Sequence, residues 1–404
     1  MIFDTCMTSI YNKALNRTTS INRLVGKIKG KYEGPTIVFF AGIHGNETAG
    51  VFALQEALKS ISPEHVHGTI YGISGNLEAL ALNQRYIDDD LNRVWFKENL
   101  KAQEKKTLLN NEEHEQMELF KILNEILQNN SPSYYFIDLH TTSSRTLPFI
   151  TINDALINRK FSSFFPVPIV LGIEEYLDGP LLSYINQLGY VSLGFESGQH
   201  DEPAAISNAV AFIFLSLVFA NLLGQKDMPN FKEYYTQLKM AAENTKDVYE
   251  VTYLFRVKDN ISFKMEPNFK SFQNVNNGQL LAISDNKKIV SRYNAKIFMP
   301  LYQEKGKEGF FIIKRINPFF LKLSEVLRRI KIDNLLTIFP GISWKNKNMG
   351  VLQVNLKVAK YMVKPIFHLL GYRNKQVDGT HVHLFNRERT SKKAMYKNLF
   401  NQST

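Results

Sequence analysis

The sequence contains a single cysteine, Cys6, among its 404 residues. An intrachain disulfide is therefore excluded, and so are zinc ribbons and other sites that hold a metal through several thiolates. A metal site in this chain must rest on histidine and carboxylate side chains. The scarcity of cysteine also fits a reducing compartment, so we expect a cytoplasmic location.

Long hydrophobic runs and a secretion signal are also missing. Residues 1–20 do not combine a charged segment with an apolar run and a small-residue cleavage site. The longest apolar stretch, from Ala209 to Leu223, is shorter than the roughly 20 residues that a membrane-spanning helix needs. We predict that this stretch is a buried helix.

Acidic residues are scarce at the carboxyl end. Residues 316–404 contain 16 lysines and arginines against 4 acidic residues, whereas the first 315 residues are close to neutral. Such a surface can be solvated or face another subunit, or it can attract an anionic partner. The sequence does not favour nucleic acid as that partner. A peripheral membrane contact through the basic extension stays possible. The sequence does not indicate the oligomeric state.

Strand and helix patterns alternate through the first half of the chain. Residues 36–41 and 134–139 are apolar runs typical of buried strands, and helical spacing follows the first of them. The pattern predicts an α/β fold with a mostly parallel or mixed sheet flanked by helices. Short strands without convincing helices then predict a small β domain. We expect three domains, which are residues 1–225, 246–315 and the basic extension 316–404.

Candidate metal ligands stand where two of these strands end. His44 and Glu47 lie three residues apart in a loop after the first strand, and His140 follows the strand at 134–139. Zinc bound by two histidines and one carboxylate keeps a position open for water, which suits a hydrolase. A His-x-x-Glu pair alone is a weak signal, and a histidine after a strand is often an ordinary hydrogen-bonded residue. Asp138 could support His140 from the same strand face.

Two further groups of polar residues could belong to the same site. Arg85, Asn92 and Arg93 could bind a carboxylate or stabilise an oxyanion, but this polar segment could equally be a capped helix start. Glu196 ends an apolar strand and could accept a proton from an activated water, or it could simply cap a helix.

These segments together carry a resemblance to a known family. Gly42-Ile-His-Gly-Asn-Glu47, the run from Arg85 to Arg93, Asp138-Leu-His140-Thr and Glu196-x-Gly-Gln199 occur in the order of the succinylglutamate desuccinylase/aspartoacylase family. That family is zinc-dependent and similar to the metallocarboxypeptidases. The resemblance covers residues 36 to about 224, and more loosely the β region to about 315. It implies a zinc carboxypeptidase-like catalytic domain in residues 1–225.

The resemblance also implies a reaction, which is hydrolysis of an N-acyl amino acid or a similar amide bearing a free carboxylate. It implies that His44, Glu47 and His140 bind one zinc ion. Glu196 would be the general base and acid, and Arg85 would polarise the scissile carbonyl. Asn92 and Arg93 would hold the carboxylate of the amino-acid half of the substrate.

The chain departs from the family in two places. No arginine lies between Leu181 and Phe195, which argues against a diacid substrate like N-acetylaspartate, and Tyr302 matches the family's β-domain tyrosine only weakly. One alternative function is a carboxypeptidase acting on short peptides. Another is a non-catalytic protein that binds a membrane or anions through the basic extension.

Overall fold

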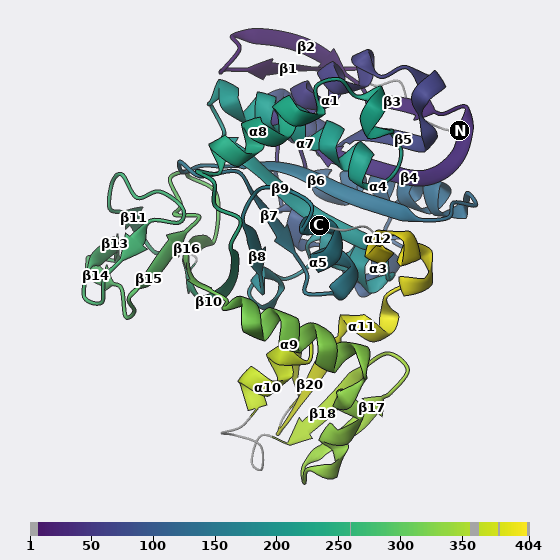
Figure 1. Ribbon diagram of the computed structural model, residues 1–404. Coiled ribbons are helices and arrows are strands. Elements are labelled where there is room, and N and C mark those ends of the chain that lie inside the picture. The colour runs from purple at the N-terminus through teal and green to yellow at the C-terminus, as the bar shows by residue number, and fades with distance from the viewer. Residues whose placement is uncertain (1–6, 259, 356–362, 379, 402–404) are drawn as a thin grey trace.

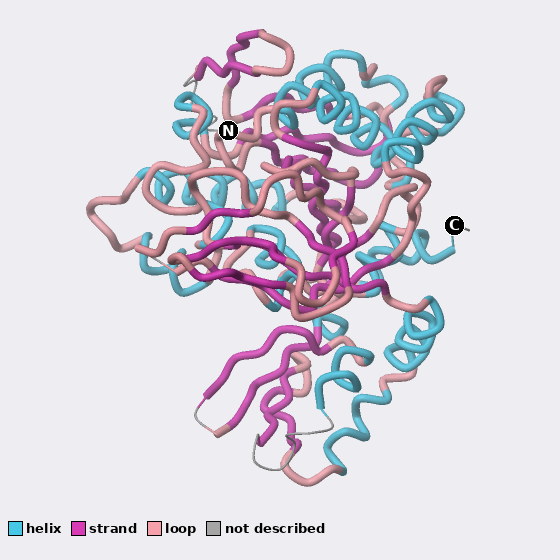
Figure 2. Tube along the Cα trace, turned by 90° about the vertical axis from the view of Figure 1, so that its left-hand side faces the viewer, coloured by secondary structure: helices cyan, strands magenta, loops and turns pink. Residues whose placement is uncertain are grey.

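A computed structural model of the chain describes residues 7–258, 260–355, 363–378 and 380–401. Its centre is a mixed sheet of 11 strands that runs through most of the molecule (Figures 1 and 2). The predicted fold class, a mixed α/β sheet flanked by helices, is confirmed. In spatial order the strands are β12 (Asn274–Val275), β15 (Ala295–Phe298), β16 (Glu308–Arg315), β10 (Val248–Arg256), β8 (Ile169–Leu171), β7 (Phe149–Ile152), β9 (Val191–Gln199), β6 (Tyr134–Thr142), β4 (Tyr32–Ala41), β5 (His67–Ser74) and β3 (Leu24–Lys29).

Helices cover both faces of this sheet because its central strands are apolar on both sides. Val38 and Phe39 alternate along β4, and each belongs to a different buried cluster. The cluster on one face includes side chains of α1 (Ala49–Ser60), α5 (Leu156–Ser162) and α7 (Pro203–Phe219), with α8 (Phe231–Ala241) packed against α7. The cluster on the other face includes side chains of α3 (Lys97–Gln103), α4 (Asn111–Gln128) and α6 (Leu181–Gln187).

The apolar stretch near Ala209 lies in α7 and is buried, as predicted. None of the described helices combines the length and apolar composition needed to cross a membrane.

The β region after residue 246 is joined to the central sheet. Strand β10 pairs in parallel with β8 through Val248 and Ile169, and β16 pairs with β10 on its other side. Strands β15 and β12 extend the central sheet beyond β16, whereas β11 (Phe263–Met265), β13 (Leu280–Ser284) and β14 (Lys287–Val290) form a separate antiparallel sheet. The sheet therefore crosses the expected boundary at residue 246, and the three-domain division stays a prediction.

Most of the basic extension forms a separate lobe beside the central sheet, and its last helices return to the first half of the chain (Figure 1). Helix α9 (Pro318–Arg329) precedes an antiparallel sheet in the order β17 (Ile342–Asn346), β18 (Val351–Asn355), β20 (His381–Asn386) and β19 (Tyr372–Asp378). The short helices α11 (Arg387–Thr390) and α12 (Lys397–Asn401) then pack back onto the first half of the chain. Tyr396 is buried there and hydrogen-bonds the backbone of Tyr134 and Val191.

Candidate metal centre and substrate pocket

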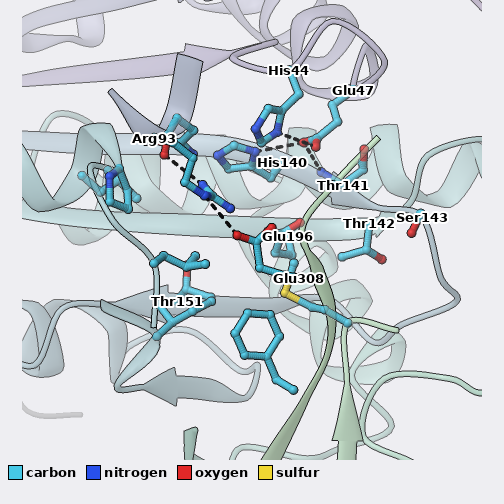
Figure 3. A pocket seen from close by; sticks show the side chains of 18 of the residues that line it. His44, Glu47, Arg93, His140, Thr141, Thr142, Ser143, Thr151, Glu196 and Glu308 are labelled. Carbon is cyan, nitrogen blue, oxygen red and sulfur yellow. Dashed lines mark hydrogen bonds and ion pairs between the residues drawn. The ribbon is translucent and has the colours of Figure 1, made fainter. Parts of the chain in front are cut away.

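Three potential metal ligands meet at the carboxyl ends of β4 and β6 (Figure 3). His44, Glu47 and His140 are buried, and one ligand atom of each lies within 4.8 Å of the others. The Nδ1 atom of His44 is 2.7 Å from Oε1 of Glu47, and the Nδ1 atom of His140 is 2.9 Å from Oε2. The structure therefore brings together the three residues that the sequence singled out as ligands.

Their positions follow from the sheet and from one glycine. Strands β4 and β6 are parallel neighbours with Ala41 opposite Leu139, so the residues that follow this pair along the two strands emerge side by side. Gly42 adopts a φ of 71°, a left-handed conformation that glycine accommodates without strain, and it turns the chain out of β4. The backbone N–H of Thr141 donates to Glu47 at 3.0 Å and fixes that carboxylate.

Each imidazole is oriented by a second carboxylate. The Nε2 atom of His140 lies 2.7 Å from Asp138, and that of His44 lies 3.1 Å from Asp90. A proton on Nε2, donated to the carboxylate, leaves the Nδ1 lone pair free for a metal ion. Burial alone would raise the pKa of Glu47, but the positive charge of His44 and His140 in their protonated forms outweighs it and holds that pKa well below its usual range. An ionised carboxylate with two such nitrogens suits zinc.

The polar segment at 85–93 lies against this cluster. Arg85 donates to Asp90 at 3.0 Å and approaches Glu47 to 3.6 Å. The segment is held by the buried Glu112 of α4, which accepts the backbone N–H groups of residues 87, 88 and 89 at 2.7–3.0 Å. Asp90 also caps a short 3₁₀ turn at Leu91–Arg93, so part of the helix-cap interpretation is correct as well.

Asn92 and Arg93 line the same pocket, but both already have protein partners. The amide oxygen of Asn92 accepts the backbone N–H of Leu181 at 3.0 Å. Arg93 donates to Glu308 of β16 at 3.3 Å (Figure 3). Burial alone would raise the pKa of Glu308, but Arg93 holds it below its usual range. A substrate carboxylate would therefore meet an arginine that is partly neutralised.

Glu196 faces the cluster from the adjacent strand. It is the register partner of His140 across the parallel β6–β9 pair. The side chain is buried, and none of the described residues hydrogen-bonds its Oε2 atom. Burial raises the pKa of Glu196 to about 8, and the nearby Glu47 adds to the effect. A buried, unpartnered carboxyl beside a metal centre is a typical proton carrier.

The structure adds site residues that sequence reasoning missed. Asp90, Glu308 and Glu174 all contribute to the site: Asp90 contacts His44 and Arg85, and the two glutamates line the pocket. Only Asp90 carried a local signal, since it lies within a polar run between two expected site residues. Tyr302 does not line this pocket, because its hydroxyl is turned toward the backbone of residues 266 and 269.

The comparisons with known proteins agree with this geometry. A sequence model of the succinylglutamate desuccinylase/aspartoacylase catalytic domain matches residues 33–201. A probable aspartoacylase from Acaryochloris marina is 30% identical over 163 residues, which are 38% of this chain and 52% of the relative. The succinylglutamate desuccinylase of Photorhabdus laumondii is 35% identical over 112 residues, which are 26% of this chain and 33% of the relative. The matched segments thus span about half or less of these relatives.

Solved structures extend the likeness in fold. A succinylglutamate desuccinylase/aspartoacylase from Rhodobacter sphaeroides superposes with a TM-score of 0.56 at 15% identity, covering 78% of this chain and 98% of that one. The succinylglutamate desuccinylase of Vibrio cholerae gives a TM-score of 0.52 at 16% identity, covering 77% and 91%. At such identities the likeness is one of fold alone. The family likeness rests on the sequence match, which pairs residues 33–201 with the catalytic domain of the succinylglutamate desuccinylase/aspartoacylase family.

Proposed function

We propose that the protein is a zinc-dependent amidohydrolase that cleaves an N-acyl amino acid, or a similar amide bearing a free carboxylate, into a carboxylic acid and a free amine. The observation that carries this proposal is the buried His44–Glu47–His140 cluster, which shares one pocket with Glu196. The names of the relatives as desuccinylases and aspartoacylases support the same reaction class.

Zinc bound by His44, Glu47 and His140 would lower the pKa of a water molecule to near 7 and polarise the scissile carbonyl. Glu196 would accept a proton from the attacking water and pass it to the leaving nitrogen, because its carboxyl faces the cluster with an unpartnered oxygen. Because Glu196 is buried, little water screens the interaction of its carboxyl with the charge that develops in the reaction.

The cationic residues would position the substrate. Arg85 stands beside Glu47 and would stabilise negative charge on the carbonyl oxygen. Asn92 and Arg93 would hold the substrate carboxylate, with Arg93 exchanging part of its contact to Glu308 for the substrate.

Metal analysis of the purified protein tests the first half of the proposal. We expect close to one zinc per chain, and we expect His140→Ala to lose most of it. His114→Ala is the matched control, because His114 is exposed on α4 and lies outside the cluster. A protein without zinc in which His140→Ala changes neither metal content nor activity would overturn the proposal.

Turnover tests the second half. Glu196→Gln keeps the shape of the side chain but removes the proton carrier, so we expect kcat to fall about 10²- to 10⁴-fold with zinc retained. A panel of N-acyl amino acids set against short peptides separates this activity from a carboxypeptidase. Hydrolysis of the peptides alone would establish the alternative. Absence of turnover on both panels would support a non-catalytic binding protein.

A further inference from the structure

The pocket does not end at the candidate metal centre. It continues along the sheet past Thr151 and Ser192 and reaches Glu174, beyond the ends of β7 and β8 (Figure 3 labels Thr151). Ser192 precedes Glu196 by four residues on the same face of β9, which corresponds to roughly 13 Å at 3.3 Å per residue. The pocket is therefore long enough for an extended group on one side of the scissile bond.

Gly194 leaves room for a residue that lines this part of the pocket. Thr151 lies opposite Gly194 in the β7–β9 pair, and a Cβ at residue 194 would stand 2.6 Å from the Thr151 hydroxyl. Because residue 194 has no side chain, the Thr151 side chain can occupy this space and line the pocket. Farther along, Ile173, Leu177 and Pro180 supply apolar wall, which suits methylene groups.

Glu174 closes the far end with an unsatisfied carboxylate oxygen. Its side chain is only 6% exposed, and its Oε1 atom accepts the backbone N–H of Asp154 at 3.0 Å. None of the described residues hydrogen-bonds Oε2. Burying a polar atom without a partner is unfavourable, so an acceptor left unpaired in a ligand pocket suits a hydrogen-bond donor on the ligand.

The neighbouring charges do not fill this role. The Asp154 carboxylate accepts hydrogen bonds from three arginines, which are Arg159, Arg328 and Arg373. Arg373 also donates to Glu175 at 3.3 Å. Arg387 shares with Glu174 a second cavity of about 560 Å³, and its positive charge attracts the Glu174 carboxylate. No hydrogen bond joins Arg387 and Glu174 among the described contacts.

The orientation of a bound substrate follows from Asn92 and Arg93, which we propose hold the carboxylate of its amino-acid half. Asn92 is bonded to Leu181 at the start of α6, and Ser183 of the same helix lines the passage farther in. An amino acid held by Asn92 and Arg93 would therefore direct its side chain toward Glu174.

We infer that Glu174 is a specificity-determining residue, which binds the basic end of a long amino-acid side chain such as that of ornithine, lysine or arginine. This inference rests on the proposed function. A cationic nitrogen would form a charge-assisted hydrogen bond with Oε2, whereas the carboxylate of an acidic side chain would be repelled. A short side chain would leave Glu174 out of reach.

The test compares kcat/KM of the zinc-loaded protein for the Nα-acetyl derivatives of ornithine, lysine, arginine, glutamine, norleucine and aspartate. We expect a preference of tenfold or more for at least one basic substrate over norleucine. Glu174→Gln should remove most of that preference, measured as the ratio of kcat/KM for the best basic substrate to kcat/KM for norleucine. Glu98→Gln is the matched control, because Glu98 is an exposed carboxylate at the rim of the adjoining cavity.

Several results would overturn the inference. One is a wild type that hydrolyses the norleucine or aspartate derivative as well as the basic ones, and another is a glutamine derivative preferred over all of them. If Glu174 served only as counter-ion to Arg387, Glu174→Gln would lower stability and leave the substrate preference intact.

Calorimetric binding of free lysine and free norleucine separates this inference from the proposed function, since it needs no turnover. Tighter binding of lysine that is lost in Glu174→Gln would support the subsite even if no amide were cleaved. Equal binding of both amino acids, together with cleavage of the norleucine derivative, would leave the proposed function standing and reject the role of Glu174.

Discussion

Glu174 is also a stability determinant whose effect depends on pH. Burial raises its pKa to about 7 from an ordinary value of 4.5, although the positive charge of Arg373 counteracts part of the effect. Between those pH values the folded protein keeps a proton that the unfolded chain releases. The associated stability is therefore fully present below about pH 4.5 and is lost as the pH rises through 7.

This shift predicts how Glu174→Gln behaves, because glutamine does not titrate. The shift corresponds to on the order of 3 kcal/mol. From pH 5 to pH 8, we expect wild type to lose roughly that much free energy of unfolding relative to the variant, measured by urea titration. Glu98→Gln should follow wild type at every pH. A constant difference between wild type and Glu174→Gln across this range would contradict the prediction.

The loop between β4 and α1 is the element on which the His44–Glu47–His140 cluster depends. Gly45 lies between His44 and Glu47 and packs against the segment that carries Arg85. A Cβ at residue 45 would overlap the backbone of Ala79 and the carbonyl oxygen of Gln84. Because these obstacles are backbone atoms, one of the two segments must move.

Gly45→Ala should therefore displace His44 and Glu47, although the backbone atoms that the added Cβ overlaps belong to neither of them. We expect a lower melting temperature and a zinc content clearly below that of wild type, both measurable on the purified variant. Gly224→Ala is a suitable control, because the added Cβ there meets first the flexible carboxylate of Asp227. Full zinc content in Gly45→Ala would show that the loop tolerates the displacement.

Local sequence patterns predicted the elements that carry the metal cluster. Strands β4 and β6 contain the apolar runs 36–41 and 134–139, so their existence and approximate limits followed from the sequence pattern alone. The charged region at 97–130 holds two helices, α3 and α4, with a break between them. The capping box of Asn110 and Glu113, which starts α4, was a sequence signal for that break.

Pairing between distant strands was beyond local reasoning. The strand pattern near Val248 did not reveal that β10 would join β8, nor that β16 would bring Glu308 to Arg93. Register is set by tertiary packing, so a residue contributed by a late strand leaves no mark near the residue that it contacts.

At the scale of the whole molecule, the basic extension is fastened to the catalytic region by buried ion pairs. The Arg328 guanidinium is fully buried and donates to Asp154 at 2.9 and 3.1 Å. Removing one partner of such a pair leaves a buried charge without compensation. Some of the positive charge in the extension is therefore structural.

Arg328→Met should destabilise the protein by about 3–5 kcal/mol in urea unfolding. Arg329→Met is the matched control on the next residue. Arg329 is 58% exposed and pairs with Glu325 at the surface, so its loss should cost about 1 kcal/mol or less. Equal effects of the two substitutions would show that the extension is not held by its contact with Asp154.

The peripheral membrane contact expected from the extension stays a prediction, and α9 is the place to test it. Phe319 of this helix and Ile330, the residue at its carboxyl-terminal cap, are each 64% exposed, and the exposed Lys322, Arg329 and Lys331 lie near them in sequence. An amphipathic helix of apolar and basic residues suits an anionic lipid surface. Deletion of residues 316–404 is a poor test, because Arg328 and Tyr396 pack into the catalytic region.

Phe319→Ser combined with Ile330→Ser removes apolar surface from α9 without touching those buried contacts. We expect wild type to sediment with phosphatidylcholine vesicles that contain phosphatidylserine, and to do so less as salt rises. The double variant should bind on the order of a hundredfold more weakly, since each of the two exposed side chains contributes on the order of 1.5 kcal/mol when buried in lipid. Met240→Ser serves as control, because Met240 is 67% exposed on α8. Sedimentation of the double variant at the wild-type level, or none by wild type, would leave the extension with a structural role alone.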